Sequence, residues 1–179
     1  SLIQNLVYLM NLLVQDEKAS ALLQNIVELT PTFEKWRQIA DESKYGYQEV
    51  LANIASLYLQ IALRFPDFPD NLIYFSIEQF PPLDINETAP MTEAIINLVG
   101  SKQDPNMYEQ AALAFTRFFV QEDSKIDKAK ISDEIKVHMV RFLKEIFSQS
   151  EQVFGKVRAS YGRQKSKIRK IEALLNSDI

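Results

Sequence analysis

The chain has no cysteine, one histidine and only four glycines among its 179 residues. Without cysteine it can form no disulfide bond and offers no thiolate nucleophile or metal ligand. So few glycines favour helices over a turn-rich β-fold, and no segment alternates as a strand would. No apolar run reaches the roughly 18 residues that span a bilayer, and no signal peptide is visible. We expect an intracellular protein, in the cytoplasm or the nucleus.

Residues that could carry catalysis are as scarce as cysteine. A Ser/His/Asp arrangement needs a histidine that reaches a nucleophile from a pocket. His138 instead stands in an apolar helical stripe between Ile135 and Met139, which is typical of a core or half-buried histidine. The isolated glycines form no phosphate-binding loop, and no Glu-x-x-His or EF-hand spacing is present. We therefore expect no enzyme activity, no cofactor and no metal site.

Helical periodicity dominates what is present. Apolar residues recur at three- and four-residue spacing from Leu2 to Val14, in a stripe wide enough to be buried on more than one side. The pattern from Gly46 to Phe65 is apolar on two sides, which indicates a helix packed between neighbours. Residues 122–130 form a polar linker, and a single last helix is expected from about Ser150 to Leu175. The whole pattern predicts about nine helices.

Two short helices joined by an Asp-Pro turn are the most informative feature. The first runs from Met91 to Gly100, and the second follows Asp104-Pro105 and carries the run Ala111-Ala112-Leu113-Ala114-Phe115. Small residues in the second helix allow a neighbour to approach closely. Such a pair cannot bury its apolar face alone, and units of this kind stack.

The stretch from Gly100 to Phe119 resembles a HEAT repeat, because the Asp-Pro turn and the alanine-rich run stand about where that family places them. The long helices and proline-rich corners elsewhere are similar to the divergent repeats of importin-β and exportin-type proteins. The resemblance implies a right-handed superhelix of antiparallel helix pairs whose concave side grips a protein partner. We expect an all-α fold of the HEAT or armadillo-like α-solenoid type, with a compact multi-helix bundle as the alternative.

Charge is divided unevenly along the chain. Residues 1–155 carry 13 Lys and Arg against 22 Asp and Glu, whereas residues 156–179 carry 7 against 2. We therefore separate a helical-repeat-like body, residues 1–149, from a basic C-terminal helix, residues 150–179. The basic helix could bind an acidic protein, could bind nucleic acid or an anionic membrane surface through residues 156–170, or could simply be solvated. Its cations are Lys156, Arg158, Arg163, Lys165, Lys167, Arg169 and Lys170.

Aromatic residues crowd a proline-rich corner between residues 65 and 82. Phe65, Phe68, Tyr74 and Phe75 either pack on their own core or form a protein-binding patch, where aromatic side chains supply anchor energy. The chain also opens inside an apolar pattern and without methionine, so we expect a piece of a larger protein. The sequence thus predicts a non-catalytic scaffold or adaptor that binds another protein, with a nucleic-acid-binding helical domain as the alternative.

Overall fold

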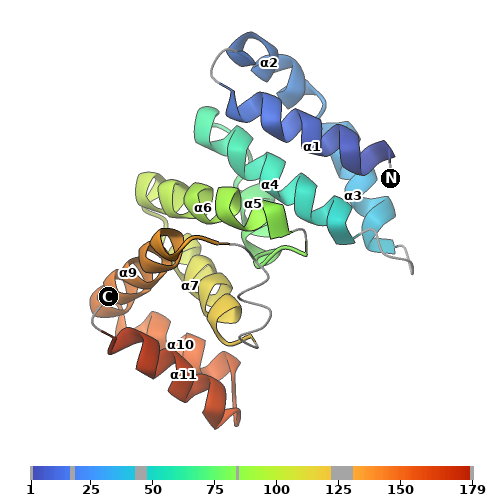
Figure 1. Ribbon diagram of the computed structural model, residues 1–179. Helices are drawn as coiled ribbons and strands as arrows, with labels where there is room; N and C mark the ends of the chain where they lie inside the picture. Colours follow the sequence, from blue (N-terminus) through green and yellow to red (C-terminus); the bar gives the residue numbers. More distant parts are fainter. Residues whose placement is uncertain (1, 17–18, 43–47, 84, 122–130, 178–179) are drawn as a thin grey trace.

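A computed structural model describes the chain apart from residues 1, 17–18, 43–47, 84, 122–130 and 178–179. The described residues form ten α-helices and one 3₁₀ turn, without a strand, so the predicted all-α class is confirmed (Figure 1). The elements are α1 (Leu2–Gln15), α2 (Ser20–Glu28), α3 (Thr30–Glu42), α4 (Gln48–Arg64), α5 (Asp70–Glu78), η2 (Ile85–Glu87), α6 (Thr88–Lys102), α7 (Pro105–Phe119), α9 (Asp133–Gln149), α10 (Glu151–Ser160) and α11 (Lys165–Leu175).

The helices contact one another mainly as near neighbours along the chain. One series of contacts runs from α1 to α4, from α4 to α6 and from α6 to α9, and a second runs from α5 to α7 and from α7 to α10. Contacts between α4 and α5, α6 and α7, and α9 and α10 join the two series. Helices α1 and α2 therefore lie at one end of the molecule, and α10 and α11 lie at the other (Figure 1).

Helix α4 lies at the centre of the N-terminal half. It contacts α1, α3, α5 and α6, and buries most of its length, including Tyr58. The prediction that this helix packs between neighbours is confirmed. Helix α1 differs from its prediction, because only Val7, Asn11 and Val14 are buried there while Leu2 stays 84% exposed. The reason is that α4 and α2 cover one side of α1 and leave the rest of its apolar stripe uncovered.

The turn between α6 and α7 forms as predicted. Asp104 caps α7, since its Oδ1 accepts a hydrogen bond from the Asn106 N–H at 2.9 Å, and Pro105 occupies the first helical turn. Ala111 and Ala112 are fully buried, as expected of small residues at a close helix contact. Helix α6 begins at Thr88, earlier than the predicted start near residue 90, because η2 leads directly into it.

The prediction of a single C-terminal helix is wrong, because this segment forms two helices, α10 and α11. Tyr161 ends α10, and Gly162 follows with φ +52°, the left-handed conformation that glycine adopts without a steric penalty. The Gly162 N–H bonds to the Ala159 carbonyl at 3.0 Å. Tyr161 itself is 7% exposed and donates its hydroxyl to Thr116 Oγ1 of α7 at 3.2 Å. Tyr161 follows Val153 and Val157 at four-residue spacing, so it continues the buried face of α10 up to the break.

A buried polar network ties α1 to the helices beneath it. The Asn11 Nδ2 donates to Ser56 Oγ of α4 at 2.9 Å and to Glu87 Oε2 of η2 at 2.8 Å. All three side chains are buried, so each bond replaces one that water made in the unfolded chain. The predicted linker at residues 122–130 lies outside the described residues. None of the described helices combines the length and the apolar character needed to cross a bilayer.

Candidate functional site

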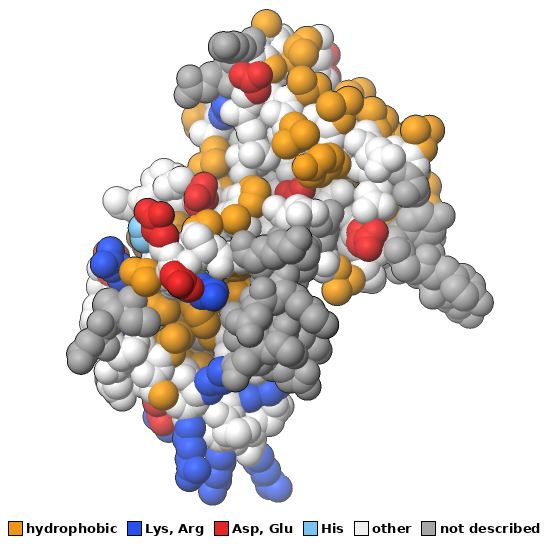
Figure 2. All heavy atoms as spheres, viewed as in Figure 1, with side chains coloured by type: hydrophobic (Ala, Val, Ile, Leu, Met, Phe, Trp, Pro, Cys, Tyr) orange, Lys and Arg blue, Asp and Glu red, His pale blue; other side chains and the backbone are white. Residues whose placement is uncertain are grey.

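The basic cluster forms around the break between α10 and α11. Arg158 comes from α10, Arg163 from the turn, and Lys165 and Arg169 from the first turns of α11. These four exposed cations line a hollow of about 480 Å³, whose wall also includes Gly162, Ile168 and Glu172. Figure 2 shows Lys and Arg side chains projecting from this end of the molecule. We call this site the basic hollow.

The other three predicted cations are engaged elsewhere. Lys156 Nζ lies 2.5 Å from Glu109 Oε2 of α7, and Lys170 Nζ donates to the Gln121 carbonyl at 2.9 Å. The Lys167 ammonium stands 6.0 Å from the centre of the Tyr161 ring, within the range of a cation–π contact. Lys156 and Lys170 attach α10 and α11 to the body, and Lys167 attaches α11 to the end of α10. The seven cations of the sequence thus divide into four that line the hollow and three that attach the two helices.

Two features of the basic hollow were missed in the sequence. Ile168 gives it an apolar side, and Glu172 Oε1 lies 3.4 Å from Arg158 Nη2. That pair is about half exposed, so it neutralises Arg158 only weakly. The missed signal was Gly162, which stands just where a helix would end with a left-handed residue. An anionic group in the hollow would face Arg163, Lys165 and Arg169 and find a single carboxylate there.

The aromatic corner belongs to the core. Phe68 is only 3% exposed and its ring lies 5.5 Å from that of Tyr58, so it is not available to a partner. Phe65, Tyr74 and Phe75 are half-buried against the same core. The guanidinium of Arg37 covers the Phe75 ring at 4.7 Å. The interpretation of Phe68 as a binding residue is therefore wrong, because the corner folds inward onto α4.

An ion pair fastens this corner from the side of α3. Arg37 donates twice to Glu34, with Nε at 3.0 Å from Oε1 and Nη2 at 2.8 Å from Oε2, and the Tyr58 hydroxyl donates to Oε1 at 2.7 Å. Burial alone would raise the pKa of Glu34, but the bonds from Arg37 and Tyr58 outweigh it and lower that pKa. Burial and the same carboxylate raise the pKa of Tyr58. The cluster therefore favours an ionised Glu34 and a neutral Tyr58, an arrangement suited to holding α3, α4 and α5 together.

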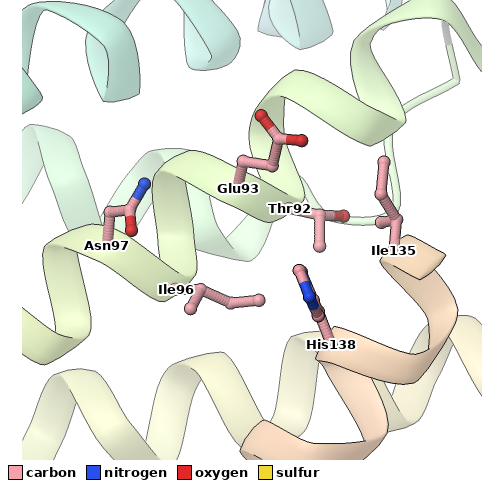
Figure 3. Close-up of a pocket in the computed structure, with 6 residues that line it drawn as sticks. All are labelled: Thr92, Glu93, Ile96, Asn97, Ile135 and His138. Atoms are coloured by element: carbon pink, nitrogen blue, oxygen red, sulfur yellow. The ribbon is translucent and has the colours of Figure 1, made fainter.

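His138 lies on the surface, which corrects the interpretation of a core or half-buried side chain. It lines a pocket of about 220 Å³ between α6 and α9, together with Thr92, Glu93 and Ile96. In Figure 3 the imidazole points toward Ile96 and Thr92, while the Glu93 carboxylate points away from it. Among the described residues no hydrogen bond or ion pair joins His138 to a carboxylate or hydroxyl. The residue faces α6 because α9 is rotated to bury Met139 and Val140 instead.

The part of the chain that the structure describes contains no group of three or more His, Cys, Asp or Glu side chains arranged to hold a metal ion. No protein-family model, curated protein or solved structure matches the chain.

Proposed function

We propose that this chain is a non-catalytic helical scaffold, built as a HEAT-like stack of helix pairs, that binds an acidic segment of another protein in the basic hollow. The stack is supported by the two series of contacts, α1–α4–α6–α9 and α5–α7–α10. The links within α6–α7 and α9–α10 are also short, which favours antiparallel neighbours.

The single observation that carries the binding proposal is the convergence of four cations on one hollow at the end of an acidic body. Arginine is suited to carboxylates, because its planar guanidinium can donate two parallel hydrogen bonds to one carboxylate. Arg158, Arg163 and Arg169 surround the hollow, and Ile168 offers an apolar contact beside them. The ligand that fits is an acidic peptide segment carrying an apolar residue.

Nucleic acid is the second candidate, and two observations favour the acidic protein over it. Residues 1–155 carry an excess of acidic side chains, which repels a polyanion longer than the hollow. Single-stranded nucleic acid also needs exposed aromatic faces on which bases can stack. Tyr161, the aromatic residue of the segment 156–170, is buried against α7 and carries Lys167 over its ring.

The test measures the binding of three fluorescent probes: a Glu- and Asp-rich peptide with a central leucine, an oligouridine RNA, and phosphatidylserine vesicles. We expect the peptide to bind most tightly, and the Lys165→Glu/Arg169→Glu variant to weaken it by about tenfold or more. The matched control is Lys35→Glu/Arg141→Glu, which reverses one exposed lysine of α3 and one exposed arginine of α9 that do not line the hollow. It should change the affinity by less than about threefold.

Each contrary result is decisive. If the RNA bound most tightly and the Lys165→Glu/Arg169→Glu variant weakened that binding, the ligand of the hollow would be nucleic acid and not an acidic protein. If the control variant weakened peptide binding equally, the net charge of the protein and not the basic hollow would determine the affinity. Both variants should keep the wild-type melting temperature, because all four exchanged side chains are exposed.

A further inference from the structure

Three hollows follow one another along α9, the first two beside α6 and the third beside the first turns of α7 and α10, and neighbouring hollows share lining residues. The first lies between Thr92 and His138 and measures about 220 Å³. Ile96 connects it to a second hollow of about 150 Å³, and Tyr108, Ile146 and Gln149 connect the second to a third of about 190 Å³. We call this row of three hollows the α6–α9 groove. It shares no lining residue with the basic hollow.

The floor of the groove is apolar and half-exposed. Ile96, Tyr108, Ile135 and Phe142 are packed against the core on one side and open to the groove on the other. Gly100 of α6 lines the second hollow, and a Cβ placed there would meet no atom within 4 Å. The absence of a side chain at this position therefore deepens the groove at its middle. Figure 2 shows apolar side chains over the region of α9.

The walls determine which backbone conformation can lie in the groove. Beside the first two hollows they are mainly the surfaces of α6 and α9, whose backbone N–H and C=O groups are paired within each helix, whereas the third hollow is bordered by the first turns of α7 and α10. An extended peptide would find no backbone partners along the first two hollows, whereas a helix satisfies its own backbone hydrogen bonds. The three hollows extend along α9 from Ile135 to Gln149, which is a length of about 21 Å at the rise of an α-helix. That length accommodates about four turns.

The rim of the groove sets the charge of its ligand. Glu93 borders the first hollow and Glu145 borders the second, and both are exposed. Within the described part of the chain neither forms an ion pair. Lys144, the cation nearest in sequence to the third hollow, donates to the Ser177 carbonyl, and Lys156 is paired with Glu109. An apolar floor bordered by two carboxylates that form no ion pair is complementary to apolar residues flanked by lysine or arginine.

We propose that the α6–α9 groove binds an amphipathic helix of another protein, which places three apolar side chains in the three hollows and Lys or Arg side chains on the carboxylates of Glu93 and Glu145. The apolar anchors fall at spacings of about i, i+7 and i+11, which lie on one face of a helix. This site is independent of the basic hollow, so the chain offers two surfaces of opposite charge to protein partners.

The test uses a stapled, alanine-based helix of about four turns, with leucines at the anchor spacing and lysines on the flanks. Two comparison helices replace the lysines by glutamates or the leucines by serines. Binding is followed by fluorescence anisotropy and by backbone amide chemical shifts. We expect the lysine-flanked helix to bind about tenfold more tightly than either comparison, and to shift the amides of α6 and α9.

Gly100→Leu is the decisive variant, because a Cβ at this position meets no atom within 4 Å and the added side chain would occupy the second hollow. The matched control is Gly155→Leu in α10, which also has open space around its Cβ and lies outside the groove. Both changes replace a helical glycine and should raise helix stability equally. Gly100→Leu should weaken the helix probe by about tenfold or more, and Gly155→Leu should leave its affinity unchanged.

Charge exchange provides the second variant. Glu93→Lys/Glu145→Lys should reverse the preference from the lysine-flanked to the glutamate-flanked helix. If Gly100→Leu alters the melting temperature, the charge-exchange variant becomes the decisive test, because Glu93 and Glu145 are both exposed. Equal binding of all three helices, or no effect of Gly100→Leu on a protein that melts normally, would overturn the proposal. Self-association that Gly100→Leu abolishes would overturn it too, because a second copy of the chain would then occupy the groove.

Discussion

Single polar residues decide how α1 is held at its end of the molecule. Asn11 donates to both Ser56 and the buried carboxylate of Glu87, and no apolar residue could supply those bonds. A buried acceptor that loses its donor costs about 1–3 kcal/mol, more than the bond itself contributes in net terms. The polar network therefore fixes the position of α1 more strictly than the apolar contacts around it, which any residue of similar volume could make.

We expect Asn11→Ala to lower the free energy of unfolding by about 1–3 kcal/mol, because Glu87 and Ser56 each lose a donor in the core. The measurement is urea-induced unfolding followed by circular dichroism. Gln4→Ala is the matched control, since Gln4 joins the same two helices through a solvent-exposed bond to Glu49 at 2.9 Å. It should cost less than about 0.5 kcal/mol. Equal losses would show that the buried network adds nothing specific.

Tyr74 and Asp104 give the fold a dependence on pH. The Tyr74 hydroxyl donates to the Asp104 carboxylate, which also caps α7. Tyr74 and the Asn106 N–H together lower the pKa of Asp104 below its ordinary value of 3.8. The hydrogen bond to Asp104, together with burial, raises the pKa of Tyr74 from 10.0 to about 12. The pair is thus strongest between these limits, with the carboxylate ionised and the phenol neutral.

Tyr74→Phe should destabilise the protein at neutral pH, and the difference from wild type should narrow at both extremes. A lowered carboxyl pKa stabilises the fold above 3.8 and is lost as pH falls below that value. A raised phenol pKa stabilises the fold up to pH 10.0 and is lost between there and about 12. Urea midpoints of both proteins across this range provide the check. The control is Tyr8→Phe, at an exposed position of α1, whose difference in urea midpoint from wild type should not vary in this way. A difference for Tyr74→Phe that stays constant with pH would contradict the coupling between Tyr74 and Asp104.

At the scale of an element, α7 carries the packing of the C-terminal half. It contacts α5, α6, α9, α10 and α11, and its alanines give these neighbours room to approach. Ala111, Ala112 and Ala114 are all fully buried. Arg117 at its end donates to the Phe80 carbonyl from Nη2 at 3.1 Å and so attaches α7 to the segment after α5.

Ala112→Leu should therefore destabilise the protein by about 1–3 kcal/mol, because the larger side chain forces a neighbouring helix outward. Thermal and urea unfolding measure the effect. The control is Ala159→Leu, at an exposed position of α10, where the same increase in volume should be nearly neutral. An unchanged melting temperature for Ala112→Leu would mean that the alanines are not required for the close contact.

At the scale of the whole molecule, opposite charges are placed on separate surfaces. The basic hollow stands at the α10–α11 end, and the α6–α9 groove with its two glutamates lies between helices nearer the middle. An acidic partner segment is attracted to the first and repelled by the second, and a basic helix the reverse. Under the two proposals, this separation would let one chain discriminate between two kinds of protein segment, or orient a single partner that carries both.

The sequence by itself determined the helices and the local chemistry of their ends. Hydrophobic periodicity and the Asp104-Pro105 cap depend on residues a few positions apart, so they predicted the class of the fold, the α6–α7 turn and the burial of Ala111 and Ala112. It also identified the cluster of cations, since those residues are close in the chain. The HEAT-like stack and the binding of a protein partner remain predictions.

Only the tertiary structure decided which of these residues are exposed and which are buried or paired. Local periodicity does not encode contacts between helices that are distant in sequence. Such contacts bury Phe68, leave His138 exposed and pair Lys156 with Glu109. The break at Gly162 turned one basic helix into a hollow lined by four cations. The α6–α9 groove likewise exists because two helices pack side by side around a missing side chain at Gly100. Surfaces are formed by packing, and packing is a property of the whole chain.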